Sequence, residues 1–254
     1  MQVAAYQAPL GATQSPTEIL GLIREQIATC ESKGVEILCC PEAVIGGLAD
    51  YAEQPDQFAI KVESEQLQTL LEPLASDKVA TIIGFTEIHK DGSLYNSAAV
   101  FHRGQISGIY RKVHPAINKS VYSAGAETPT FRVGDLTFGI IICNDSNFPE
   151  MARKMAAQGA KAVFIPTNNG LPLNRTGLDL INLAKEVDTA LATENGVYII
   201  RADVAGGTST LVADGSTEIV APDGQILASA PLLESGLIIA EINITPDSIA
   251  GDTP

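Results

Sequence analysis

The feature that most constrains the fold is an alternation of short apolar runs, rich in β-branched residues, with longer segments of helical periodicity. The sequence predicts a strand at 2–6, a helix at 15–34 that opens with Ser15 and Glu18 arranged as a capping box, and a strand at 35–41. A strand, a helix and a strand in this order are typical of parallel strands joined by a crossover helix. The start of the chain therefore predicts a parallel pair with a helix on one face.

Hairpins follow in the rest of the chain. The turn pairs Asp91-Gly92 and Arg103-Gly104 separate three apolar runs and predict an antiparallel meander. Strands alternating with helices, together with hairpins, predict an α/β fold of two mixed sheets packed face to face, a four-layer α-β-β-α sandwich; a three-layer arrangement is the alternative. The remaining strands are expected at 79–88, 94–102, 106–112, 135–143, 161–166, 197–203, 208–214, 217–221, 225–230 and 236–244, and the remaining helices at 64–78, 148–160 and 177–196.

Composition limits the number of domains and the kinds of partner. The 254 residues contain no Gly/Ser-rich or Pro-rich linker, so we expect one domain over 1–254 with a polar tail from about residue 243. The net charge is -14 and the 16 Lys and Arg residues form no basic patch, which disfavours nucleic acid and membrane surfaces as partners. No apolar run approaches the ~20 residues that span a bilayer, so we expect a cytoplasmic protein.

Three predicted strands end on residues that can do chemistry. Glu42 follows one strand, and Lys112 and Cys143 each end another. Ligands bind beyond the carboxyl ends of strands in α/β sheets, so these three residues are candidate catalytic groups that only the fold could bring together. None of the four cysteines has the CxxC spacing of zinc or redox pairs, and we expect four free thiols. They are Cys30, Cys39, Cys40 and Cys143.

Two interpretations of Cys143 are open from the pattern alone. It precedes a turn and the expected helix start at Phe148 and Pro149. Backbone N–H groups near a helix start, together with a nearby Lys112, would lower the pKa of the thiol and make it a nucleophile. Alternatively, Cys143 is a packed core thiol, as free cysteines often are.

Three segments carry a resemblance to a known family. The stretches CCPEAVIGG at 39–47, YRKVHP at 110–115 and GIIICNDSNFPE at 139–150 resemble, in this order, the signature segments of the nitrilase superfamily, the carbon-nitrogen hydrolases. The resemblance extends through AKAVFIPTN at 160–168 and ATENGVYIIRADVAG at 192–206. The segment around Cys143 is most similar to amidase members, whereas nitrilases usually have a tryptophan beside the cysteine and this chain has none.

The resemblance implies the α-β-β-α fold and a Glu-Lys-Cys site on Glu42, Lys112 and Cys143, with no metal or organic cofactor. In the implied mechanism Cys143 attacks an amide carbonyl and Glu42 transfers protons. Lys112 and the backbone N–H of Asn144 stabilise the oxyanion, and a thioester intermediate is hydrolysed. The implied activity is an amidase that releases ammonia from a small amide.

One departure and one further expectation come with this resemblance. The loop after Lys112 lacks the second glutamate that members usually carry; Asn118 could bond in its place, or Asp145 could supply the charge, or the site is inactive. Members are commonly homodimers or larger, so we expect a homo-oligomer. Candidate contact residues lie in the helix after Cys143, although they could equally be core residues: Met151, Met155 and Ala156.

Substrate preference is less constrained. Asn168, Asn169 and Tyr51 lie in loops expected to line the cavity, and Arg175 is the one cation in those loops. We therefore expect a small neutral aliphatic or aromatic amide, with an N-carbamoyl compound or an ω-amidate of a dicarboxylic acid as the alternative. Two other functions stay open: a Cys-His hydrolase that uses His114, which would face the same way as Lys112 in an extended segment, and a catalytically silent binding or assembly module.

Overall fold

The computed structural model describes residues 1–63, 65–173 and 178–244, and its strands form two mixed sheets. The nine-stranded sheet of the described residues runs in the order β5 (Gln105–Arg111), β4 (Leu94–His102), β3 (Ala80–Ile88), β2 (Val35–Cys39), β1 (Gln2–Pro9), β11 (Val204–Gly207), β12 (Leu211–Ala213) and β9 (Leu171–Pro172), with β15 (Gly236–Glu241) also paired to β1. The six-stranded sheet runs in the order β14 (Ile226–Ser229), β13 (Glu218–Val220), β10 (Tyr198–Ala202), β8 (Ala162–Pro166), β7 (Leu136–Ile140) and β6 (Thr130–Val133).

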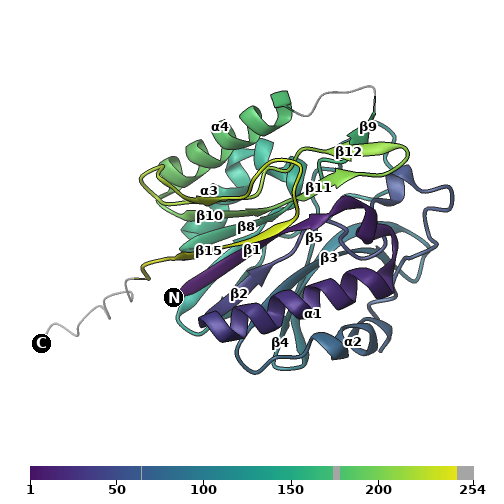
Figure 1. Ribbon diagram of the computed structural model, residues 1–254, viewed down its shortest axis with the longest axis horizontal. Coiled ribbons are helices and arrows are strands. Elements are labelled where there is room, and N and C mark those ends of the chain that lie inside the picture. Colours follow the sequence, from purple (N-terminus) through teal and green to yellow (C-terminus); the bar gives the residue numbers. More distant parts are fainter. Residues whose placement is uncertain (64, 174–177, 245–254) are drawn as a thin grey trace, which may run out of the picture.

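Helices cover the outer faces of the two sheets. The first sheet is covered by α1 (Pro16–Lys33) and α2 (Gln66–Leu71), and the second by α3 (Pro149–Ala157) and α4 (Leu178–Asn195), as Figure 1 shows. The inner faces of the sheets pack on each other in one apolar core. The predicted four-layer α-β-β-α sandwich is therefore confirmed. No helix in the described ranges is long and apolar enough to cross a membrane.

Strand β1 explains why the first apolar run is continuous. Val3 and Ala5 pack toward the second sheet, whereas Ala4 and Tyr6 pack toward the helical layer. Successive residues of a strand point to opposite faces, so a strand with a layer on each side is apolar at most of its successive positions. The same rule applies to β2. Ile37 and Cys39 pack between the two sheets, whereas Leu38 packs toward the helical layer.

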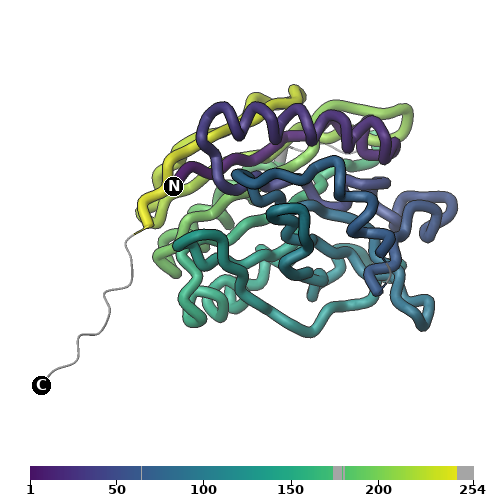
Figure 2. The backbone as a smooth tube through the Cα atoms, turned by 90° about the horizontal axis from the view of Figure 1, so that it is seen from below, coloured from purple at the N-terminus to yellow at the C-terminus, as the bar shows by residue number. Residues whose placement is uncertain are grey.

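The centre of the first sheet joins the two ends of the described chain. β1 pairs in parallel with β2 on one side and antiparallel with β15 on the other, from Gln2 opposite Glu241 to Gln7 opposite Gly236. Figures 1 and 2 both show these two strands side by side. β1 thus depends on a partner that is more than 200 residues away in sequence.

Most predicted helices and strands are confirmed, and the differences are missed strands and one helix cap. The short strands β6, β9 and β11 were not predicted. The capping box is wrong: Ser15 is the N-cap of α1, but its side chain makes no cap hydrogen bond and its N–H already donates to the Ala12 carbonyl at 3.0 Å.

Met155 is fully buried against Gly139, so it is a core residue, which was the alternative to a subunit contact. The expected polar tail falls almost entirely outside the described residues.

Gly84 of β3 fits closely under the segment that carries Glu42. A Cβ at this position would overlap the Pro41 carbonyl oxygen and the Ala43 backbone nitrogen. We expect Gly84→Ala to lower the free energy of unfolding by about 1–3 kcal/mol, because backbone must move to make room. Denaturant unfolding measures this change.

The matched control is Gly21→Ala, which places a methyl group in open space on α1. It should leave stability unchanged or raise it by up to about 1 kcal/mol, since alanine favours a helix over glycine. Equal stabilities for the two variants would contradict the close fit at Gly84.

Candidate active site

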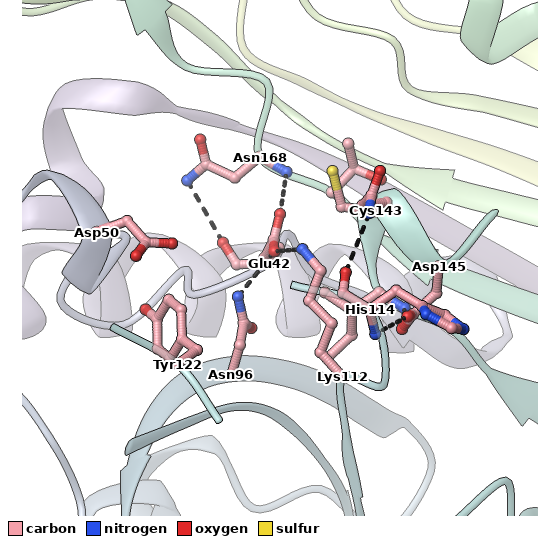
Figure 3. A network of polar contacts seen from close by, with 12 residues as sticks. Glu42, Asp50, Asn96, Lys112, His114, Tyr122, Cys143, Asp145 and Asn168 are labelled. Atoms are coloured by element: carbon pink, nitrogen blue, oxygen red, sulfur yellow. Dashed lines mark hydrogen bonds and ion pairs between the residues drawn. The ribbon is translucent and has the colours of Figure 1, made fainter. Parts of the chain in front are cut away.

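Three residues from separate strand ends meet at one cavity. Glu42 follows β2, Lys112 follows β5 and Cys143 follows β7, and all three line a cavity of about 290 Å³. The Lys112 ammonium lies 2.5 Å from the Glu42 carboxylate, on the side of Glu42 that faces Cys143 in Figure 3. The fold therefore brings together the three predicted catalytic residues.

Glu42 is held by contacts to both of its carboxylate oxygens. Oε1 accepts hydrogen bonds from Lys112 and from the Asn96 amide at 2.8 Å, and Oε2 accepts one from the backbone N–H of Asn168 at 3.0 Å. The backbone N–H of Glu42 donates to the Thr167 carbonyl at 3.2 Å. Strand β4 and the segment after β8 thus fix a carboxylate that is only 1% exposed.

Lys112 stays charged although it is buried. Burial lowers the pKa of its ammonium, but the contact with Glu42 and the nearby Cys143 and Asp145 raise it more, so the pKa is raised overall. A permanent positive charge beside the thiol suits the stabilisation of an oxyanion. It also means that Lys112 itself does not act as the general base at neutral pH.

Cys143 occupies a strained backbone position. It is the first residue of a 3₁₀ turn (Cys143–Asn147) and has a φ of 45°, in the left-handed region that non-glycine residues avoid. Asp145 fixes this turn, because its carboxylate accepts the N–H of Ile142 at 3.0 Å and of His114 at 2.7 Å, and the Tyr110 hydroxyl at 2.7 Å. The turn aims the thiol into the cavity.

Of the two open interpretations of Cys143, the one in which nearby groups lower the pKa of its thiol is wrong. Burial raises the pKa of its thiol to about 12 and the Glu42 carboxylate adds to the rise, while Lys112 and Arg201 act in the opposite direction without offsetting it. The resting form is therefore the thiol, and a base must remove its proton during attack. All four cysteines are free, as predicted, and burial also raises the pKa of the other three.

The other predicted site residues divide into two groups. Asn144, Asn168, Asn169 and Tyr51 line the cavity, and the Asn169 side chain lies 4.0 Å from the Cys143 sulfur. Asn118 is exposed and is not among the described lining residues, while Asp145 is buried within the 3₁₀ turn that begins at Cys143. Arg175 lies outside the described residues. Among the residues that are described, no cluster of three His, Cys, Asp or Glu side chains could hold a metal ion.

His114 has a different environment from the one that a Cys-His hydrolase needs. β5 ends at Arg111, so Lys112 and His114 do not share one face of a strand. The imidazole stacks on Phe148 with ring centroids 3.6 Å apart, and His114 is not among the described lining residues. Its backbone, rather than its ring, contributes to the site through Asp145 and Asn144.

A buried ion pair at the cavity was not predicted from the sequence. The Arg201 guanidinium on β10 binds the Asp188 carboxylate of α4, with an Nε to Oδ2 distance of 2.6 Å. It also donates to the Thr167 hydroxyl at 2.8 Å and to the Ser146 hydroxyl at 3.2 Å. Arg201 thus ties the turn after Cys143 to the segment that binds Glu42. The signal in the sequence is a single arginine inside the apolar run VYIIRAD.

Comparison with known proteins agrees with this geometry. Residues 2–245 match the family model of the carbon-nitrogen hydrolases. The chain is 32% identical over 211 residues to an (R)-stereoselective amidase of a Pseudomonas species, covering 80% of this chain and 72% of that enzyme. It is 28% identical over 262 residues to N-carbamoylputrescine amidase of rice, covering 96% and 86%. A structure of the amidase from Nesterenkonia sp. AN1 matches with a TM-score of 0.79 at 26% identity, covering 96% and 93%.

The chain belongs to the carbon-nitrogen hydrolase family. The resemblance read from the signature segments is therefore confirmed. As a carbon-nitrogen hydrolase, the protein is expected to hydrolyse a carbon-nitrogen bond in its cavity, and the relatives named above include amidases.

The protonation state of Cys143 in this carbon-nitrogen hydrolase can be tested directly. We expect the ultraviolet absorbance of its thiolate, taken as the difference between wild type and Cys143→Ala, to appear only above about pH 10. Replacing Glu42 with glutamine removes the negative charge that raises the pKa, so the Cys143 titration should shift to lower pH. A wild-type thiolate already present at pH 7 would contradict the raised pKa.

The Arg201–Asp188 pair gives a second test. Asp188→Asn removes the carboxylate that hydrogen-bonds the buried guanidinium, and we expect a loss of about 3–5 kcal/mol in the free energy of unfolding. The double variant Asp188→Leu, Arg201→Met should recover much of that loss, because apolar side chains replace both members of the ion pair.

The control is another arginine-aspartate pair of the chain. Arg132 and Asp135 approach to 3.8 Å on the surface, with most of both side chains exposed. Asp135→Asn should change stability by less than about 1 kcal/mol, since an exposed pair is screened by water. A similar small effect at Asp188 would mean that Arg201 is not buried with its charge.

Proposed function

We propose that the protein is an amidase that hydrolyses a small amide to its acid and ammonia through a thioester on Cys143. The observation that supports this most directly is the contact of Glu42 with Lys112 in a cavity that Cys143 also lines. A carboxylate, an ammonium and a thiol provide a base, an oxyanion donor and a nucleophile.

In the proposed first half-reaction, the Cys143 sulfur attacks the amide carbonyl carbon while Glu42 takes the thiol proton. The coupling of these events follows from the raised pKa of the thiol, since free thiolate is scarce. The Lys112 ammonium and the backbone N–H of Asn144 stabilise the oxyanion. The carbon-nitrogen bond then breaks, Glu42 returns its proton to the leaving nitrogen, and ammonia departs from the thioester.

In the second half-reaction, water attacks the thioester carbonyl and Glu42 accepts a proton from that water. The carbon-sulfur bond breaks, the acid leaves, and the proton passes back to the Cys143 sulfur. Glu42 thus acts first as a base and then as an acid in each half. The proposed reaction uses no group beyond this chain, the amide and water.

Relatives support a cysteine nucleophile and also an alternative substrate. The structure of the Nesterenkonia amidase records Michael addition of acrylamide at the active-site cysteine of that enzyme. N-carbamoylputrescine amidase is a relative over nearly the whole chain, so an N-carbamoyl compound is the second candidate substrate. A silent binding module is less well supported, because Glu42, Lys112 and Cys143 all reach the same open cavity. Cytoplasmic location and a homo-oligomeric state are part of the proposal.

The experiment is a screen of small amides that measures released ammonia and, by mass spectrometry, an acyl adduct on Cys143. We expect turnover that Cys143→Ala abolishes and that Lys112→Ala lowers by about 10²- to 10³-fold, as for the loss of an oxyanion donor. His114→Ala is the matched control and should change kcat/KM by less than about threefold, because its ring stacks on Phe148.

Two outcomes would contradict the proposal. Greater damage from His114→Ala than from Lys112→Ala would favour the Cys-His scheme. An accessible Cys143 that forms no adduct and releases no ammonia across amides and N-carbamoyl compounds would favour a binding or assembly module.

A further inference from the structure

Asp50 is an acidic side chain in the cavity that the proposed chemistry does not use. It belongs to a 3₁₀ turn (Ala49–Tyr51) in the loop after Glu42, and it lines the same cavity as Cys143. In Figure 3, Asp50 and Cys143 lie on opposite sides of Glu42, and the Asp50 carboxylate points toward the middle of the site. A substrate whose amide is at Cys143 would extend past Glu42 toward this carboxylate.

The position of Asp50 is fixed from two directions. Its carboxylate accepts hydrogen bonds from the Ser120 hydroxyl at 3.0 Å and from the backbone N–H of Val121 at 2.8 Å. The preceding residue, Ala49, donates its N–H to the Tyr122 hydroxyl at 2.7 Å, and that hydroxyl also bonds Thr86 at 2.8 Å. The carboxylate is therefore held in place before any ligand binds, which reduces the entropy lost on binding.

Among the charged lining residues that the structure describes, Asp50 has no opposite charge as its partner. Four of the described lining residues are charged. Lys112 is neutralised by Glu42, and Arg201 by Asp188. Within the described ranges, no basic side chain pairs with Asp50, whose recorded partners are a hydroxyl and an amide. The remaining unpaired charge of the described lining is therefore negative.

The inner surface of the cavity is partly apolar. Leu48, Ile117, Leu183 and Val187 line it, and such side chains suit methylene groups rather than polar atoms. An anionic tail would meet repulsion from Asp50, which disfavours the ω-amidate of a dicarboxylic acid. A cation on a short aliphatic chain would satisfy both the apolar wall and the carboxylate.

We infer that Asp50 binds a cationic group at the end of the substrate remote from the scissile bond, so that the preferred substrates are amides or N-carbamoyl derivatives of short aliphatic chains that end in an ammonium or guanidinium. This inference rests on the proposed amidase function. It makes Asp50 a specificity-determining residue, and it replaces the expectation of a neutral substrate.

The test compares ω-amino amides of increasing chain length with the alkanamides of the same length. At the best length, wild type should prefer the cationic amide by about tenfold in kcat/KM, as expected for one charged contact that is partly screened by water. Asp50→Asn keeps the shape and one acceptor oxygen for Val121. It should abolish the preference while changing kcat/KM for the alkanamide by less than about threefold.

Asp56→Asn is the matched control, because Asp56 is an exposed acid of the same loop that does not line the cavity. It should keep the preference for cationic amides. A purely structural role for Asp50 would predict that Asp50→Asn lowers the turnover of cationic and neutral amides equally, and this result would overturn the inference. Equal kcat/KM for the paired amides in wild type would also overturn it.

Binding measurements separate this inference from the proposed function. Calorimetry on Cys143→Ala with the same paired amides needs no turnover, and it should show about tenfold tighter binding of the cationic member, lost when Asp50→Asn is added. Absence of hydrolysis in wild type, with this pattern of binding intact, would count against the amidase proposal and for the role of Asp50. Equal binding of the pair would count against Asp50.

Discussion

The contact between the Glu42 carboxylate and the Lys112 ammonium is the interaction on which the rest of the site depends. Each group is nearly fully buried, and either one alone would carry a desolvation penalty of several kcal/mol. Together they stay charged, and Asn96 and the Asn168 N–H satisfy the remaining carboxylate positions. A buried ion pair adds little net stability compared with apolar residues of the same size. Its presence at a cavity is therefore better explained by chemistry than by folding.

A second buried ion pair, between Arg201 and Asp188, follows the same rule, and the two pairs together determine the charge of the cavity. Arg201 and Asp188 neutralise each other, and Arg201 also donates hydrogen bonds to Ser146, in the turn that begins at Cys143, and to Thr167, whose carbonyl accepts the Glu42 N–H. Since both buried cations already have partners, neither is available to attract an anionic substrate. Selectivity by charge then falls to the partly exposed Asp50, which is held by hydroxyl and amide donors.

Much of this arrangement could be read from the sequence, and the exceptions have physical causes. Continuous apolar runs and hairpin turns predicted the four layers, and Glu42, Lys112 and Cys143 were found because each ends a buried strand. β9 and β11 were missed because two to four residues are too few to show a periodicity. No pattern in the sequence distinguishes Asp188, and only the packing of α4 on β10 shows its partner. The direction of the pKa shift at Cys143 depends on burial and on the distance to Glu42, neither of which a sequence contains.

The pairing of β1 with β15 has a consequence for how the protein folds. β1 lies in the middle of the larger sheet, yet most of one edge of it is completed by residues 236–241. During synthesis the backbone groups of β1 that pair with β15 therefore stay unpaired until residues 236–241 have left the ribosome. Contacts between residues so distant in sequence form slowly, because a very long loop must close first. The nascent chain is most prone to aggregate in that interval, and chaperones that shield exposed strand edges would act on it there.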